Sequence, residues 1–136
     1  MKDTSKQQGN VDASGNSSIA NLSAKSYLII KVYKSTIQNR GNSLEEAVRW
    51  GWIINPQRAA GRTILAATVD DSVIQEVYQP TQAADWLPRS RNKNVTFYEI
   101  RSGVLKKSSA PTMRQLVGKK LPNKYTRSRY GIRYVN

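Results

Sequence analysis

The chain has 136 residues, no cysteine, no histidine and a formal net charge of +13. Without cysteine there is no disulfide framework, and without histidine there is no Ser-His-Asp triad, no His-ligated zinc and no histidine general base. The length fits one domain of ordinary size. No apolar run is long enough to cross a membrane and the N-terminus lacks a targeting pattern, so we expect a cytoplasmic protein with no membrane partner.

The positive charge is concentrated in the C-terminal part of the chain. Residues 86–136 carry 13 Lys or Arg and a single acid, Glu99, whereas residues 1–85 are close to neutral. Self-repulsion on this scale opposes compactness, and a phosphate backbone relieves it with release of condensed counterions. The distribution favours a nucleic-acid partner. An acidic protein surface, or no charged partner at all, are the alternatives.

Residues 1–24 are half Ser, Asn, Gln and Gly, which predicts a disordered polar tail. We expect residues 25–136 to form a single α+β domain with a basic C-terminal half. Its first element is a central strand over residues 26–33, rich in aliphatic and aromatic residues. A polar connection over residues 34–42 follows.

Two short helices are predicted next. Ser43 is the N-cap of the first, with Glu46 as the returning half of a capping box, and this helix runs to about Arg49. In the second, Asn55 is the N-cap and a proline follows it at the first helical position. The remaining predicted elements are strands 63–69 and 72–79 paired as an antiparallel hairpin, a loop over 80–92, a strand over 95–101, a short helix over 111–118 and a strand over 131–135.

Five short strands with small helices predict an α+β domain built on a small, curved mixed sheet or a partly open β-barrel. A Rossmann-type fold is disfavoured because its crossover helices are longer and its phosphate loop is missing from this sequence.

Three tryptophans are candidates for base stacking. Trp50 and Trp52 flank Gly51 between the two predicted helices, and Trp86 lies in the predicted loop. An exposed aromatic side chain stacks on a base with a free energy of about 1–3 kcal/mol. The alternative is that each indole fills the core, where tryptophan is usually buried.

Basic residues alternate with tyrosines and small polar residues from Lys119 to Tyr134. Such a segment can lie along a phosphate backbone, with Lys and Arg on the phosphates and Tyr on sugars or bases. The alternative is a solvated edge strand whose charges prevent aggregation. The candidate contacts to a nucleic-acid backbone are Arg89, Arg91, Lys106, Lys107, Arg114, Lys119, Lys120, Lys124, Arg127, Arg129 and Arg133.

The acids Asp70, Asp71, Glu76 and Glu99 partly match the metal-binding pattern of restriction-type nucleases, an Asp followed by Glu-x-Lys. Here Arg101 holds the lysine position, and an arginine cannot be deprotonated to act as a base. We therefore expect no metal, no cofactor and no catalytic residue.

The order of segments resembles a known family. The resemblance lies in residues 44–60, 64–79, 86, 97–101, 114–120 and 132–136. In chain order, these segments are a capped LEEAVR helix, a Trp-rich turn, an N-P-x-R-A helix, a hairpin, a Trp loop, an FYEI strand, a GKK helix end and an I-x-Y-V-N strand. This order resembles small bacterial and phage domains similar to the PUA-like superfamily, which includes EVE and ASCH domains. The resemblance implies a reader of RNA or of a modified base, with Trp50, Trp52 and Trp86 at the positions able to line its pocket.

Together these features predict a non-enzymatic nucleic-acid-binding domain. A pocket containing tryptophan would read a modified or flipped base, and a basic C-terminal face would hold the phosphate backbone, of DNA or RNA. The alternative is a phage or bacterial interaction or inhibitor protein whose basic face docks on an acidic protein surface.

Overall fold

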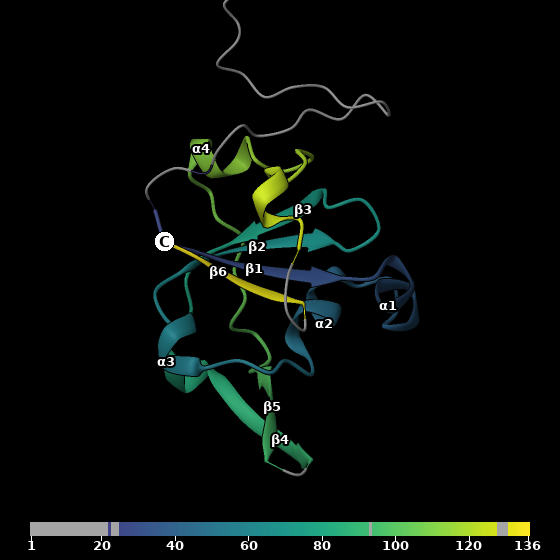
Figure 1. Cartoon of the computed structure of the whole chain (residues 1–136), viewed down its shortest axis with the longest axis vertical. Coiled ribbons are helices and arrows are strands. Elements are labelled where there is room, and N and C mark those ends of the chain that lie inside the picture. The colour runs from purple at the N-terminus through teal and green to yellow at the C-terminus, as the bar shows by residue number, and fades with distance from the viewer. Residues whose placement is uncertain (1–21, 23–24, 93, 128–130) are drawn as a thin grey trace, which may run out of the picture.

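The computed structural model describes Leu22 and residues 25–92, 94–127 and 131–136. Within these residues no helix is long and apolar enough to span a bilayer. The elements in chain order are β1 (Tyr27–Val32), α1 (Lys34–Asn39), α2 (Leu44–Arg49), α3 (Pro56–Ala59), β2 (Thr63–Thr68), β3 (Ile74–Tyr78), the 3-10 helix η2 (Ala83–Asp85), β4 (Trp86–Asn92), β5 (Val95–Ile100), α4 (Pro111–Arg114), the 3-10 helix η3 (Asn123–Tyr125) and β6 (Ile132–Val135). Figure 1 labels the α-helices and the strands.

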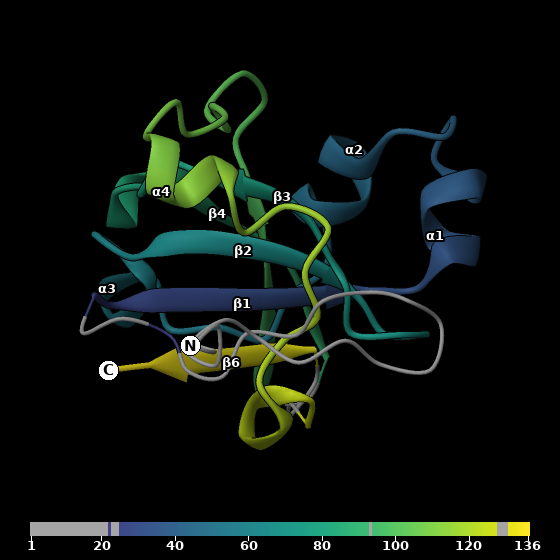
Figure 2. The ribbon, with the colours of Figure 1, turned by 90° about the horizontal axis from the view of Figure 1, so that it is seen from above.

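A four-stranded mixed sheet in the order β3-β2-β1-β6 forms the centre of the fold. Strand β1 runs parallel to β2 and antiparallel to β6, and β3 runs antiparallel to β2. Figure 2 shows β2, β1 and β6 side by side. Strands β4 and β5 form a separate antiparallel hairpin. The α+β class and the small mixed sheet are confirmed, and the strands of the described residues do not close into a barrel.

Both faces of the sheet are covered, so every residue of β1 is buried. Leu28 and Ile30 lie in one cluster with Val48 of α2 and with side chains from α3 and the β4–β5 hairpin. Ile29 lies in a second cluster with Met113 of α4. Figure 1 shows α4 on one side of the sheet, with α3 and the hairpin on the other. Burial on two faces explains why this strand is an almost continuous apolar run rather than an alternating one.

The N-caps predicted at Ser43 and Asn55 are confirmed, but the capping box predicted at Ser43 is only half formed. The Ser43 hydroxyl accepts a hydrogen bond of 3.1 Å from the backbone N–H of Glu46. The returning half is wrong: the Glu46 carboxylate accepts from the Arg49 guanidinium at 2.9 Å, and the backbone N–H of Ser43 donates to the carbonyl oxygen of Arg40 instead. At α3, the Asn55 side chain accepts from the backbone N–H groups of residues 57 and 58. Each cap satisfies donors that the first helical turn leaves unpaired.

Two predicted connections are wrong. Residues 34–39 form α1, which has no side-chain cap and no buried residue, so the sequence carries no periodic signal for it. Residues 86–92 form β4 although Pro88 lies within them. The register of β4 and β5 shifts between Pro88 and Ser90, and an edge strand with such an irregularity accommodates a proline.

The polar tail predicted for residues 1–24 contains one described residue, Leu22. Its side chain is only 6% exposed and packs in the second cluster, so this position belongs to the core rather than to a solvated tail. Residues 1–21 and 23–24 lie outside the described part of the chain, and the prediction for them is not tested.

We expect Leu22→Ala to lower the free energy of unfolding by about 2 kcal/mol, because it removes a buried side chain from the second cluster. Urea denaturation followed by circular dichroism measures this change. Val95→Ala is the matched control, since Val95 is exposed and its truncation should have little effect. A Leu22 variant as stable as the unmodified protein would show that this residue contributes nothing to the core.

Candidate functional site

A cavity of about 540 Å³ lies at the carboxyl end of β1, beside α1 and the end of α2. We call it the tryptophan pocket. Two of the three tryptophans line it, together with an exposed tyrosine and an exposed arginine. The lining residues are Lys31, Val32, Tyr33, Thr36, Arg40, Ala47, Trp50, Gly51, Trp52, Val69 and Gly131.

Trp50 follows α2 directly and is 37% exposed. Its indole Nε1 donates a hydrogen bond of 3.2 Å to the Glu46 carboxylate. The guanidinium carbons of Arg49 and Arg40 lie 5.3 Å and 5.7 Å from the ring centroid. Arg49 is buried whereas Arg40 is exposed, so Arg40 is the cation that can rearrange around a ligand.

Trp52 is half-buried and joins the pocket to the hairpin. Its indole Nε1 donates a hydrogen bond of 2.6 Å to the carbonyl oxygen of Val48. Its backbone exchanges two hydrogen bonds with Tyr98 of β5, at 3.0 Å and 2.8 Å. Gly131 has a φ of +78°, and a Cβ atom there would lie 2.8 Å from the Trp52 ring. A glycine is therefore required where the chain passes this indole.

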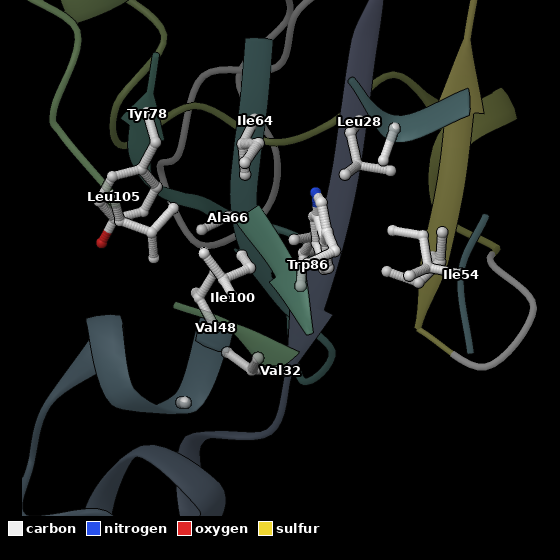
Figure 3. Close-up of a cluster of buried hydrophobic side chains, with 14 residues drawn as sticks. Leu28, Val32, Val48, Ile54, Ile64, Ala66, Tyr78, Trp86, Ile100 and Leu105 are labelled. Atoms are coloured by element: carbon white, nitrogen blue, oxygen red, sulfur yellow. The ribbon is translucent and has the colours of Figure 1, made fainter. Parts of the chain in front are cut away.

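Trp86 is a core residue, and the prediction that it stacks on a base is wrong for this structure. It is only 3% exposed, and its Nε1 donates a hydrogen bond of 3.0 Å to the Thr81 hydroxyl. Figure 3 shows its indole within the apolar cluster, near Ile100 and Val48. The reason is that residue 86 begins a strand beneath the sheet instead of lying in an open loop.

A buried carboxylate connects Trp50 with the β4–β5 hairpin. Glu99 is 2% exposed and accepts hydrogen bonds from Arg49, at 3.0 Å, and from Arg89. Arg49 also donates to the carbonyl oxygen of Ile100 at 2.9 Å. Two guanidinium groups thus satisfy one buried acid, which is the condition under which a carboxylate is tolerated in a core.

Lys31 borders the tryptophan pocket, and its ammonium group is buried. It donates to the Ser72 hydroxyl at 3.2 Å and to the carbonyl oxygen of Thr126. Desolvation lowers the pKa of this lysine. The contact fixes residue 126 to the end of the sheet near the pocket.

The acids of the nuclease pattern are each engaged by cations or hydrogen-bond donors. Asp70 accepts from the backbone N–H of Lys34 at 3.0 Å, and Asp71 pairs with the Lys34 ammonium at 3.1 Å. Glu76 pairs with Arg114 and, at 3.6 Å, with Lys107. Burial opposes ionisation of Glu76, but these donors hold its pKa below the ordinary value. Among the described residues no three His, Cys, Asp or Glu side chains form a group able to hold a metal.

The predicted backbone-binding residues do not share one face. Arg89 and Arg91 lie on the hairpin, and Arg129 lies outside the described residues. A second set adjoins β3: the outer edge of this strand hydrogen-bonds to residues 108 and 119, and Gln79 just after it bonds to residue 106. This set comprises Lys106, Lys107, Arg114, Lys119 and Lys120. A third set lies near the Tyr125 ring and comprises Lys124, Arg127 and Arg133.

Sequence reasoning missed four polar or aromatic residues of the pocket: Lys31 on β1, and Tyr33, Thr36 and Arg40. The last three lie in or beside α1, which carries no helical signal in the sequence, and only the tertiary fold brings them to Trp50. Comparison with models of protein families, with curated proteins and with solved structures found no match to this chain.

The Trp50–Glu46 contact has a defined pH dependence. The hydrogen bond from the Trp50 indole, and next the one from Arg49, hold the pKa of Glu46 below its ordinary value. The ionised carboxylate therefore accepts the hydrogen bond from the indole N–H at neutral pH, and protonation of Glu46 weakens this contact only as the pH falls through the lowered pKa. We expect the Trp50 indole N–H resonance to stay constant from neutral pH down to the ordinary pKa of glutamate and to shift below it.

Two-dimensional NMR of the indole region measures this titration, and Glu46→Gln is the control that should remove it. A shift centred at or above the ordinary pKa of glutamate would contradict the contact.

Proposed function

We propose that this protein is a non-enzymatic nucleic-acid-binding domain that takes one base into the tryptophan pocket. The observation that carries the proposal is the joint placement of Tyr33, Trp50 and Trp52 around one cavity, with exposed Arg40 at its wall. Aromatic faces with a neighbouring guanidinium are the usual means by which proteins hold an unpaired base.

The size and electrostatics of the pocket support this function. Its volume of about 540 Å³ lies within the range of about 300–1,000 Å³ that is typical of small-ligand sites. Its lining residues include Lys31 and Arg40 and no Asp or Glu. An anionic ligand therefore meets no acidic side chain on the wall, and the net charge of +13 attracts it from a distance.

The scattered basic residues support several weak contacts to phosphates rather than one continuous track. Each neutralised phosphate makes the binding constant depend more steeply on salt concentration. Lys106 and Lys124 are exposed and lie in separate sets, so each contributes to attraction without being part of the pocket.

We also propose a relationship to the PUA-like superfamily. The order of segments in the sequence and the mixed sheet with an aromatic pocket at one end support it. A cytoplasmic location follows as a proposal from the nucleic-acid partner.

We expect Trp50→Ala to weaken binding of a short single-stranded oligonucleotide by about 1–3 kcal/mol, because it removes an accessible stacking face. Its melting temperature should change little, since Trp50 is partly exposed. Trp50→Phe is the matched control and should retain most of the affinity. Fluorescence anisotropy of a labelled oligonucleotide measures binding, and iodide quenching should show that the ligand protects Trp50.

Two results would contradict this function. If Trp50→Ala binds as well as the unmodified protein, the pocket takes no base and only phosphate contacts contribute. If the unmodified protein binds no oligonucleotide at low salt, an acidic protein surface becomes the better explanation of the charge.

A further inference from the structure

We propose that the β4–β5 hairpin enters the major groove of duplex DNA while the tryptophan pocket holds an unpaired base of the same duplex. This inference rests on the proposed function and adds the class of ligand: a DNA duplex containing one extruded or unpaired base, in place of a plain single strand.

The hairpin is anchored at one end and uncovered at the other. Trp86 and Ile100, which are paired at its base, are both buried in the core. Figure 1 shows that the hairpin extends beyond α3 and away from the sheet. Every residue from Pro88 to Asn92 is exposed, and so is Val95 on the returning strand. The side chains of the outer half are therefore accessible to solvent.

Four exposed side chains of this outer half are hydrogen-bond donors, and two of them are cations. Arg89, Ser90, Arg91 and Asn92 are consecutive on β4. A hollow of about 250 Å³ lies along this stretch, between Pro88 and Thr96. The one acid in the sequence of the hairpin, Glu99, is buried and shared by two arginines. The surface that the hairpin presents is thus complementary to phosphates and to acceptor groups on bases.

The width of a two-stranded ribbon selects the groove. The major groove of B-DNA is about 12 Å wide and admits such a ribbon, whereas the minor groove is about 6 Å wide and admits one only when the DNA is deformed. The major groove of A-form RNA is narrow and deep, so side chains on a ribbon do not reach its bases. The hairpin therefore fits a DNA duplex better than an RNA duplex.

The hairpin and the pocket are held together at a fixed spacing. Trp52 and Tyr98 exchange two backbone hydrogen bonds, and Glu99 binds Arg49, which lies against Trp50. Val95 is three residues from Tyr98, or roughly 10 Å along an extended strand. Tyr98 pairs with Trp52, which lines the pocket, so the outer hairpin begins within about one duplex diameter of the pocket and one duplex can contact both.

The test compares two probes with the full chain: a 20-base-pair DNA duplex with one unpaired base, and the single strand that contains this base. The variants are Arg91→Gln alone and Arg89→Gln combined with Arg91→Gln. The control is Lys106→Gln combined with Lys124→Gln, which removes the same charge from exposed sites away from the hairpin. Because Arg89 contacts buried Glu99, the melting temperature of each variant is measured first.

We expect the double hairpin variant to lose at least tenfold in affinity for the duplex probe and to leave single-strand affinity nearly unchanged. The slope of log K against log salt should become shallower by about 0.9 for each arginine that contacts a phosphate. If the double variant does not fold, Arg91→Gln alone should show the same selective loss of affinity for the duplex probe, with a smaller fold-change. Control variants should lose affinity equally for both probes.

Groove choice is tested with the same duplex carrying bulky glucosylated hydroxymethyl groups at cytosine C5, and with netropsin bound in the minor groove. The bulky groups should prevent binding and netropsin should not. Equal losses on both probes, inhibition by netropsin alone, or equally tight binding of the matching RNA duplex would overturn the inference. A failure of the proposed function gives a different result from a failure of this inference: Trp50→Ala then binds both probes as tightly as the unmodified protein does.

Discussion

Burial of β1 on both faces is the constraint on which the rest of the structure depends. A strand with apolar side chains on both sides is stable only when separate layers cover each side. Residues from α2, α3 and the hairpin supply one layer, and α4 with the segment around Leu121 supplies the other. The pocket lies where β1 ends, because there the first layer is reduced to α1, Trp50 and Trp52.

Glu99 couples the pocket to the hairpin through charge. A buried carboxylate loses its hydration, and only well-placed donors offset that loss. Arg49 and Arg89 provide them from two different elements, and Arg49 is held further by Glu46 and a carbonyl oxygen. The network contributes orientation more than stability: it holds one arginine against Trp50 and another on the uncovered strand.

The distribution of charge in space differs from its distribution in sequence. The C-terminal part contains nearly all of the net charge, yet its cations divide among the hairpin, the edge of β3 and the surroundings of Tyr125. Arg114 is bound to Glu76 and so has an internal partner. A ligand that uses these charges has to touch several parts of the molecule, which favours an extended polyanion over a small anion.

The sequence by itself determined those features that depend on neighbouring residues. The apolar run of β1, the caps at Ser43 and Asn55, and the β2–β3 hairpin are all local patterns, and each is present. Only the tertiary structure decided which tryptophan lines the pocket and which fills the core. The local sequence around each indole does not distinguish a core position from a pocket position, because burial depends on contacts between segments far apart along the chain. The pairing of β4 with β5 buried Trp86, and the approach of α1 to the end of α2 opened the pocket around Trp50.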